Sequence, residues 1–348
     1  MERILIQSGD QAACEILIGE GIATAAASAL PDRAGRDKLA LFYQPGAEHI
    51  AVQLEGGLRA LGYQVASRVL PDREAAKTLA VAEDAYLFLN EFGMTRGDTI
   101  VAVGGGAATD LGGFVGATYL RGVETVLVPT TLLGAVDAAI GGKTAVNVGG
   151  KNLAGVFNHP ARVLIDTDVL AQLPRELLIE GTAEALKAGL IADVELVRLY
   201  QSFGLAAPID EVVARAVRVK ADVVGADFTE QGRRAVLNYG HTIGHAVEFV
   251  TGIPHGHAVA IGIVAAGAVS QDLLGFDAAA EQMELLASLE LPVAAPPADR
   301  DAVEAAILLD KKRDTSGVRM ILLEAFGKPA VQSVDMTTVR AALSAVGI

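Results

Sequence analysis

Hydrophobic positions in the first half of the chain alternate between two patterns. Short apolar and β-branched runs predict strands at 3–7, 15–18, 38–42, 64–69, 99–103, 125–128 and 163–165. Between them, segments 48–61 and 73–92 repeat apolar residues at spacings of three and four, as amphipathic helices do. Strands that alternate with helices predict βαβ units and a parallel sheet.

The pattern changes near residues 165–175, after which β-rich runs nearly vanish. Helical periodicity covers 175–191, 211–226, 240–250, 256–274, 277–289 and 301–309. Prolines at 292, 296 and 297 indicate loops between the last two of these segments. We therefore expect an α/β N-terminal domain at 1–172 and an all-α C-terminal domain at 173–348. We expect the active site in the cleft between the two domains.

Length and composition agree with two globular domains, because 348 residues exceed what one core usually supports. The net charge of −14 disfavours nucleic acid as a partner. The lone Cys14 excludes an intrachain disulfide and fits a reducing compartment. No signal peptide is recognisable, and apolar stretches such as 258–269 are too short to cross a bilayer. We expect a cytoplasmic protein that does not enter membranes.

Three predicted strand ends carry polar or glycine-rich turns. The strand 99–103 runs into Gly104, Gly105 and Gly106, where backbone N–H groups at a helix start can approach a pyrophosphate. The spacing differs from the usual G-x-G-x-x-G, so the triplet alone is a weak signal. Asp72, Glu74 and Lys77 follow one further strand, and Thr130 and Thr131 follow another. Ordinary helix capping by Asp72 and Thr130 is the alternative.

The predicted helical half contains a set of metal-binding residue types. His241 and His245 are four apart and project from one helix face, while Glu184 and Lys187 are three apart on another helix. With His255 and His257 nearby, imidazoles and a carboxylate predict a divalent metal with an open position. Spacing alone leaves open which histidines bind metal and which transfer protons.

Cations and amides that suit an anionic substrate are spread along the same region. In an acidic protein, lysines near glycine turns either surround a bound anion or lie on a solvent-exposed face. The positions concerned are Lys143, Lys151, Lys187, Lys220, Arg234, Asn238, Lys311 and Lys312.

Taken in order, these motifs resemble the 3-dehydroquinate synthase family over nearly the whole chain. The resemblance rests on Gly-Gly-Gly at 104–106 with Asp-Leu-Gly-Gly-Phe at 110–114, Ala-Thr-Tyr-Leu-Arg-Gly-Val at 117–123, Pro-Thr-Thr-Leu-Leu at 129–133, Val-Asp at 136–137, Gly-Gly-Lys-Thr-Ala-Val-Asn at 141–147, Gly-Lys-Asn at 150–152, Ala-Glu-Ala-Leu-Lys at 183–187, Asn-Tyr-Gly-His-Thr-Ile-Gly-His at 238–245, His-Gly at 255–256 and Asp-Lys-Lys at 310–312. One departure is a loop between Lys143 and Lys151 that is one residue shorter than expected.

The resemblance implies a Rossmann-like NAD-binding domain, a helical metal-binding domain and a homodimer. It implies zinc or cobalt held by Glu184, His241 and His255, which leaves His245 for proton transfer. The residues implied to line NAD are Asp72, Glu74, Lys77, Gly104, Gly105, Gly106, Asp110, Thr130, Thr131, Lys143, Lys151, Val169, Leu170, Ala171 and Gln172. Those implied to contact substrate or act in catalysis are Arg121, Asp137, Lys143, Asn152, Lys187, Lys220, Arg234, Asn238, His245, Lys311 and Lys312.

The implied reaction converts 3-deoxy-D-arabino-heptulosonate 7-phosphate to 3-dehydroquinate and phosphate, in the shikimate pathway to aromatic amino acids. It comprises transient oxidation, phosphate elimination, re-reduction and intramolecular aldol closure, with Arg121, Lys143 and Asn152 holding the phosphate. Three alternatives remain: another sugar-phosphate cyclase, a metal-dependent polyol or alcohol dehydrogenase that releases reduced cofactor, and a non-catalytic dinucleotide sensor. Arg234 with Lys311 or Lys312 favours a substrate that carries a carboxylate.

Overall fold

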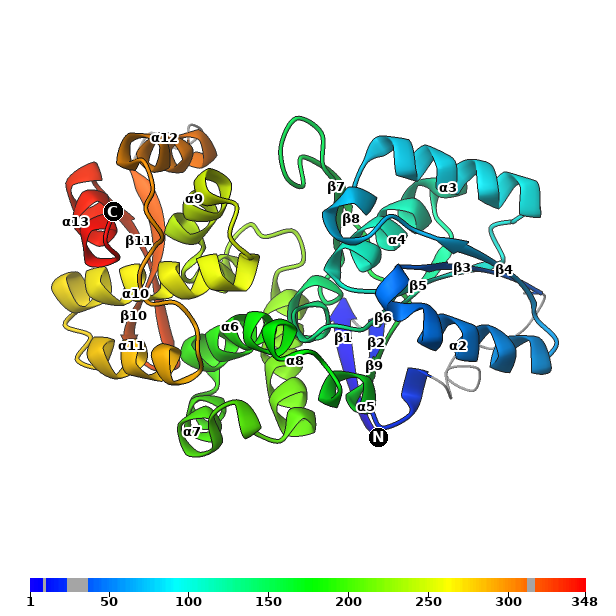
Figure 1. Cartoon of the computed structure of the whole chain (residues 1–348), viewed down its shortest axis with the longest axis horizontal. Helices are drawn as coiled ribbons and strands as arrows, with labels where there is room; N and C mark the ends of the chain where they lie inside the picture. Colours follow the sequence, from blue (N-terminus) through cyan, green and yellow to red (C-terminus); the bar gives the residue numbers. More distant parts are fainter. Residues whose placement is uncertain (9–10, 24–36, 312–316) are drawn as a thin grey trace. The chain divides into compact units, whose positions relative to one another are not determined.

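The computed structural model describes residues 1–8, 11–23, 37–311 and 317–348 (Figure 1). The described chain divides into two compact units. The first comprises Met1–Leu173 and Lys220–Thr229, and the second comprises Pro174–Val219 and Glu230–Ile348. Residues 220–229, expected in the second domain, group with the first unit by their contacts.

A seven-stranded sheet forms the middle of the first unit, counted over the described residues, with strand order β1-β2-β9-β6-β5-β3-β4. Every strand pair in it is parallel except β1 with β2. The predicted α/β organisation is therefore confirmed. The strands are β1 (Glu2–Ser8), β2 (Gln11–Gly19), β3 (Lys38–Tyr43), β4 (Gln64–Val69), β5 (Thr99–Gly104), β6 (Glu124–Pro129) and β9 (Arg162–Asp166).

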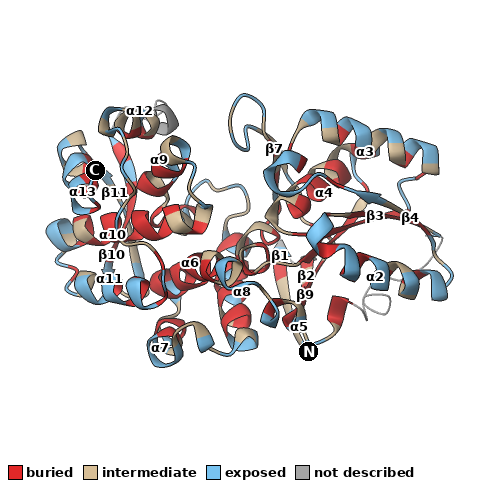
Figure 2. Cartoon of the chain, in the orientation of Figure 1, coloured by how far each residue is buried: buried red, intermediate tan, exposed pale blue. Residues whose placement is uncertain are grey.

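Helices cover both faces of this sheet (Figures 1 and 2). Helix α2 (Glu48–Ala60) buries Leu54 against one face, which includes Leu41 of β3. Helices α3 (Leu79–Phe92) and α4 (Gly106–Thr118) pack on the other face, against Phe42 of the same strand. Because both faces are buried, the central strands read as continuous apolar runs in the sequence.

The structure interrupts the predicted helix 73–92. A 3-10 turn, η2 (Arg73–Ala76), comes first, and α3 starts only after Thr78, whose hydroxyl accepts a hydrogen bond from Val81 N. A helix would have required the Lys77 carbonyl, which instead accepts from Asn147 N. Elements not predicted in this unit are η1 (Pro45–Ala47), η3 (Tyr119–Arg121), η4 (Gly134–Ala138), α5 (Thr167–Ala171) and the hairpin β7 (Lys143–Val146) with β8 (Ala154–Phe157).

The second unit is helical, as predicted, and also contains a hairpin of β10 (Val318–Ala325) and β11 (Lys328–Val334). Its central helix α10 (His255–Leu274) is apolar on nearly all sides because it packs against α6, α9, α11, α13 and β10. By length and composition α10 is apolar enough to cross a membrane, but it is mostly buried inside this unit. The other elements are α6 (Arg175–Ala192), α7 (Val194–Phe203), η5 (Gly204–Ala206), α8 (Ile209–Ala226, continuing into the first unit), η6 (Arg233–Asn238), α9 (His241–Thr251), α11 (Ala279–Ser288), α12 (Arg300–Lys311) and α13 (Met336–Ala345).

Candidate active site

The glycine turn joins β5 to α4 in the first unit. Gly104 has a φ of +154°, and a Cβ there would lie 2.7 Å from Ala108 Cβ and 2.9 Å from Gln44 Oε1. Gly105 is the N-cap, so α4 begins without a capping side chain over its N–H groups. Thr130 N donates to Gly104 O at 2.8 Å, which ties the neighbouring strand end to the turn. This arrangement suits the diphosphate of a dinucleotide.

Lys77 connects predicted cofactor residues with a predicted substrate residue. Its ammonium is buried and donates to Asp110 Oδ2 at 2.6 Å and to Asn152 Oδ1 at 2.5 Å. Burial raises the pKa of Asp110 to about 6, although Lys77 opposes the shift, and the charges of Glu74 and Asp137 raise it further. These side chains therefore form one electrostatic cluster.

A second cation reaches the same part of the first unit from α8. Lys220 is buried and donates to both the carbonyl and a carboxylate oxygen of Asp137, in η4. Lys143 starts β7 with its side chain exposed, whereas the next residue, Thr144, is buried. The structure thus brings together Asp137 and Lys220, which are 83 residues apart in sequence.

Two further groups of predicted residues lie in short helices. Arg121 ends η3, beyond the C-terminus of the 13-residue helix α4, so about 20 Å of helix separates it from the glycine turn. Of the residues implied to line NAD, Val169, Leu170 and Ala171 belong to the short helix α5, and Gln172 is its C-cap. Asp166, at the end of β9, starts this helix by accepting a hydrogen bond from Asp168 N.

In the second unit, three helices bring one carboxylate and three imidazoles together. Glu184 of α6 is 2% exposed, and its Oε1 lies 3.4 Å from His241 Nε2 and 3.5 Å from His255 Nε2. The ligand atoms of His241, His245 and His255 lie within 4.8 Å of one another. Among the described residues, Glu184 Oε1 is a buried oxygen without a hydrogen-bond partner.

This geometry fits a divalent metal. Ligands at about 2.0–2.1 Å from a tetrahedral ion are about 3.3–3.4 Å apart, close to the separations between Glu184 Oε1 and the two Nε2 atoms. Burying a carboxylate oxygen without a hydrogen-bond donor costs folding free energy unless a cation lies beside it. The solvent-exposed His245 lies on the same face of α9 as His241, with ring centroids 4.8 Å apart.

The outer nitrogens of both candidate ligands are engaged. His255 Nδ1 lies 3.0 Å from Glu248 Oε2, and His241 Nδ1 lies 3.1 Å from Tyr239 O. When Nδ1 donates to an oxygen, Nε2 presents its lone pair, the tautomer that a metal needs. The Tyr239 hydroxyl donates in turn to the buried Gln282.

Charges in this cluster shift the pKa values in opposite directions. Burial would raise the pKa of Glu184, but Lys187 and the two histidines hold it well below its usual range. Burial and Lys187 lower the pKa of His241 well below the ordinary value. Burial would also lower the pKa of His255, but the negative charges of Glu184 and Glu248 beside it raise it to about 10.

The remaining predicted residues of the second unit have defined positions. Lys187 pairs with Glu184 Oε2, Arg234 is 2% exposed in η6, and Asn238 Nδ2 donates to Glu230 Oε1 at 2.7 Å. Lys311 ends α12, but its side chain and all of Lys312 lie outside the described residues.

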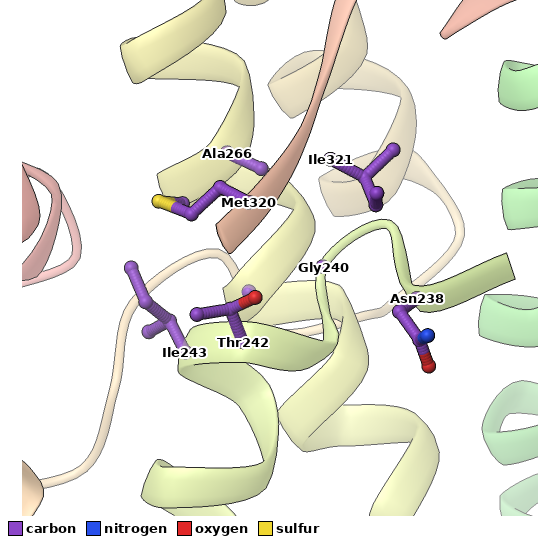
Figure 3. A pocket seen from close by; sticks show the side chains of 8 residues that line it. Asn238, Gly240, Thr242, Ile243, Ala266, Met320 and Ile321 are labelled. Carbon is purple, nitrogen blue, oxygen red and sulfur yellow. The ribbon is translucent and has the colours of Figure 1, made fainter. Parts of the chain in front are cut away.

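A small hollow beside the start of α9 has essentially no enclosed volume (Figure 3). Mainly small and apolar residues line it, among them Gly240, Ile243, Ala266 and Met320. The hollow is therefore a packing feature, and the chemistry of this unit lies in the histidine cluster.

Sequence reasoning missed several residues that support the cluster. Glu248 lies three residues after His245 and seven after His241, so its position on the same helix face was a detectable signal. Tyr239 and Gln282 gave no such signal, because their contact joins segments 43 residues apart.

Comparison with known proteins identifies the family of this chain. The family model described as 3-dehydroquinate synthase N-terminal matches residues 67–180, and the one described as 3-dehydroquinate synthase C-terminal matches residues 181–313. The chain belongs to the 3-dehydroquinate synthase family. A 3-dehydroquinate synthase from Thermobifida fusca is 43% identical over 332 residues, covering 91% of this chain and 89% of the relative. One from Corynebacterium jeikeium is 40% identical over 334 residues, covering 93% and 91%.

Solved structures of related cyclases share the whole fold. A 2-deoxy-scyllo-inosose synthase complexed with carbaglucose-6-phosphate, NAD+ and Co2+ has a TM-score of 0.87 at 26% identity, covering 98% of this chain and 99% of that one. The 2-epi-5-epi-valiolone synthase ValA from Streptomyces hygroscopicus subsp. jinggangensis 5008, with NAD+ and Zn2+ bound, has a TM-score of 0.86 at 26% identity, covering 98% of each chain.

Proposed function

We propose that this member of the 3-dehydroquinate synthase family converts 3-deoxy-D-arabino-heptulosonate 7-phosphate to 3-dehydroquinate and phosphate, using NAD and one divalent metal ion. The observation that carries the metal dependence is the buried Glu184 Oε1, which lies between His241 Nε2 and His255 Nε2. Related cyclases crystallised with NAD+ and Co2+ or Zn2+ support the cofactor assignment.

The metal would be held by Glu184, His241 and His255. When bound, the ion supplies Lewis acidity to substrate hydroxyls and NAD reversibly accepts a hydride. Lys187 neutralises the second oxygen of Glu184 and keeps that carboxylate ionised. The exposed imidazole of His245 is left to accept and return a substrate proton.

The phosphate and the carboxylate of the substrate would be bound by different residues. Lys143 and Asn152 are proposed to hold the phosphate, and Asp137 with Lys220 to orient hydroxyls. The buried Arg234, with Lys311 or Lys312, is proposed to bind the carboxylate, since a guanidinium matches a carboxylate with two parallel hydrogen bonds. This carboxylate site favours the heptulosonate over the sugar phosphates of other cyclases. We also propose that the protein is cytoplasmic and that it forms a homodimer, and sedimentation of the purified protein would test the homodimer.

The central experiment follows phosphate release from purified protein supplied with heptulosonate phosphate, catalytic NAD and a divalent cation. We expect turnover that stops after exhaustive chelation and returns with Zn2+ or Co2+, without net NADH. Stoichiometric NADH would instead indicate a dehydrogenase, and activity unaffected by chelation would refute the metal assignment. NAD binding without phosphate release would indicate a sensor.

A pair of variants tests the ligand set directly. Glu184→Gln should lower metal affinity at least about 100-fold, because it removes the anionic oxygen between the imidazoles. Glu195→Gln, on the exposed surface of α7, is the matched control and should bind metal as the wild type does. Equal metal content in both variants after dialysis would exclude Glu184 as a ligand.

A further inference from the structure

Asn147 connects the loop between β7 and β8 to the segment η2 through three hydrogen bonds. Its Nδ2 donates to Glu74 Oε2 at 2.9 Å, and its backbone N donates to Lys77 O at 2.8 Å. Its Oδ1 accepts from Asn152 N at 2.9 Å. A single side chain therefore contacts both the segment that carries Glu74 and Lys77 and the loop that carries Asn152.

These contacts hold Asn152 in an uncommon backbone conformation. Its φ is +56°, which costs a non-glycine residue energy unless the surroundings fix it. Asn147 fixes the backbone N of Asn152, and Lys77 Nζ fixes its side-chain oxygen. The intervening residues, from Val148 to Lys151, are mostly exposed and include Gly149 at a φ of +67°. Without Asn147, the backbone N–H of Asn152 would lose this acceptor, and the hydrogen bond from Lys77 would be left to hold the Asn152 side chain.

We propose that Asn147 is a positioning residue that sets the NAD-binding segment and the phosphate-binding loop together, without touching either ligand. The inference rests on the proposed function, in which Glu74 and Lys77 bind NAD and Asn152 binds the substrate phosphate. Its neutral amide suits this place, because it donates to a carboxylate on one side and accepts from a backbone N–H on the other. An aspartate would keep the acceptor but would face the Glu74 carboxylate with a like charge.

The test uses the full-length protein, with NAD and inorganic phosphate as separate probes in titration calorimetry. Asn147→Ala should weaken both NAD and phosphate about tenfold, as expected for the loss of hydrogen bonds to each segment. Asn147→Asp should weaken NAD about tenfold while phosphate affinity stays within about threefold, because only the Glu74 side is disturbed. The matched control is Asn90→Ala, which removes an acceptor for the Tyr119 hydroxyl at the end of α3 and should change neither affinity.

The outcomes separate this inference from the proposed function. Wild-type protein that binds neither NAD nor phosphate would refute the proposed function itself. Wild-type binding of both ligands with unchanged affinities in Asn147→Ala would overturn the positioning role. If that variant does not fold, Asn147→Asp decides, and a phosphate loss equal to its NAD loss would point to a merely structural effect.

Discussion

A close backbone contact between α10 and the turn that starts α9 predicts the effect of Gly262→Ala. A Cβ on Gly262 would lie 1.8 Å from Gly240 O and 2.8 Å from Gly244 N. Gly240 itself has a φ of +80°, so this turn has few alternative conformations. A carbon and a carbonyl oxygen need about 3.2 Å, so backbone would have to move by about 1.4 Å.

That shift should cost more than the alanine gains. Alanine adds about 0.5–1 kcal/mol of helix stability over glycine, whereas overpacking costs about 1–3 kcal/mol and more when the obstacle is backbone. We expect a net loss of about 2 kcal/mol, or about 4–8 °C in thermal midpoint. His241 follows Gly240 directly, so the metal affinity should fall as well.

Thermal unfolding of the metal-free protein and competition with a chromophoric chelator measure the two effects. Gly56→Ala is the matched control, since it also lies inside a helix, α2, but a Cβ there meets nothing within 4 Å. That variant should be about 0.5–1 kcal/mol more stable than the wild type. A Gly262→Ala variant as stable as the control, with wild-type metal affinity, would refute the packing argument.

Two other predictions concern single carboxylates. Glu248→Ala should lower metal affinity about 10–100-fold, measured by chelator competition, because His255 Nδ1 loses its partner. Glu248→Gln should keep part of the wild-type affinity. Equal affinity in the wild type and both variants would contradict this role of Glu248. Because the pKa of Asp110 is raised to about 6, its contribution to folding stability is fully present below its ordinary pKa and is lost as the pH rises through about 6. Wild-type stability should thus decline between pH 4 and 6.5 relative to Asp110→Asn, and a carboxyl carbon that titrates near pH 4 by NMR would argue against the shift.

The sequence by itself determined the fold class of this protein and the residue types of its candidate site. Short apolar runs such as 99–103, alternating with helical patterns, predicted a parallel sheet, and the change in periodicity near residue 170 predicted a helical second half. Residue types and their order also indicated the family. These signals lie in short stretches of sequence or in motifs that follow a fixed order, so they can be recognised without a structure.

Only the tertiary structure decided which atoms meet. The spacing of four histidines could not separate ligands from proton carriers, whereas the approach of α6 to α9 and α10 places Glu184 Oε1 beside two specific Nε2 atoms. Residues far apart in the chain also meet where Asn147 N donates to Lys77 O, where Lys220 donates to Asp137, and where Asn147 Nδ2 donates to Glu74. Such pairings depend on how packed elements approach one another in space, which a periodicity of two or 3.6 residues does not encode.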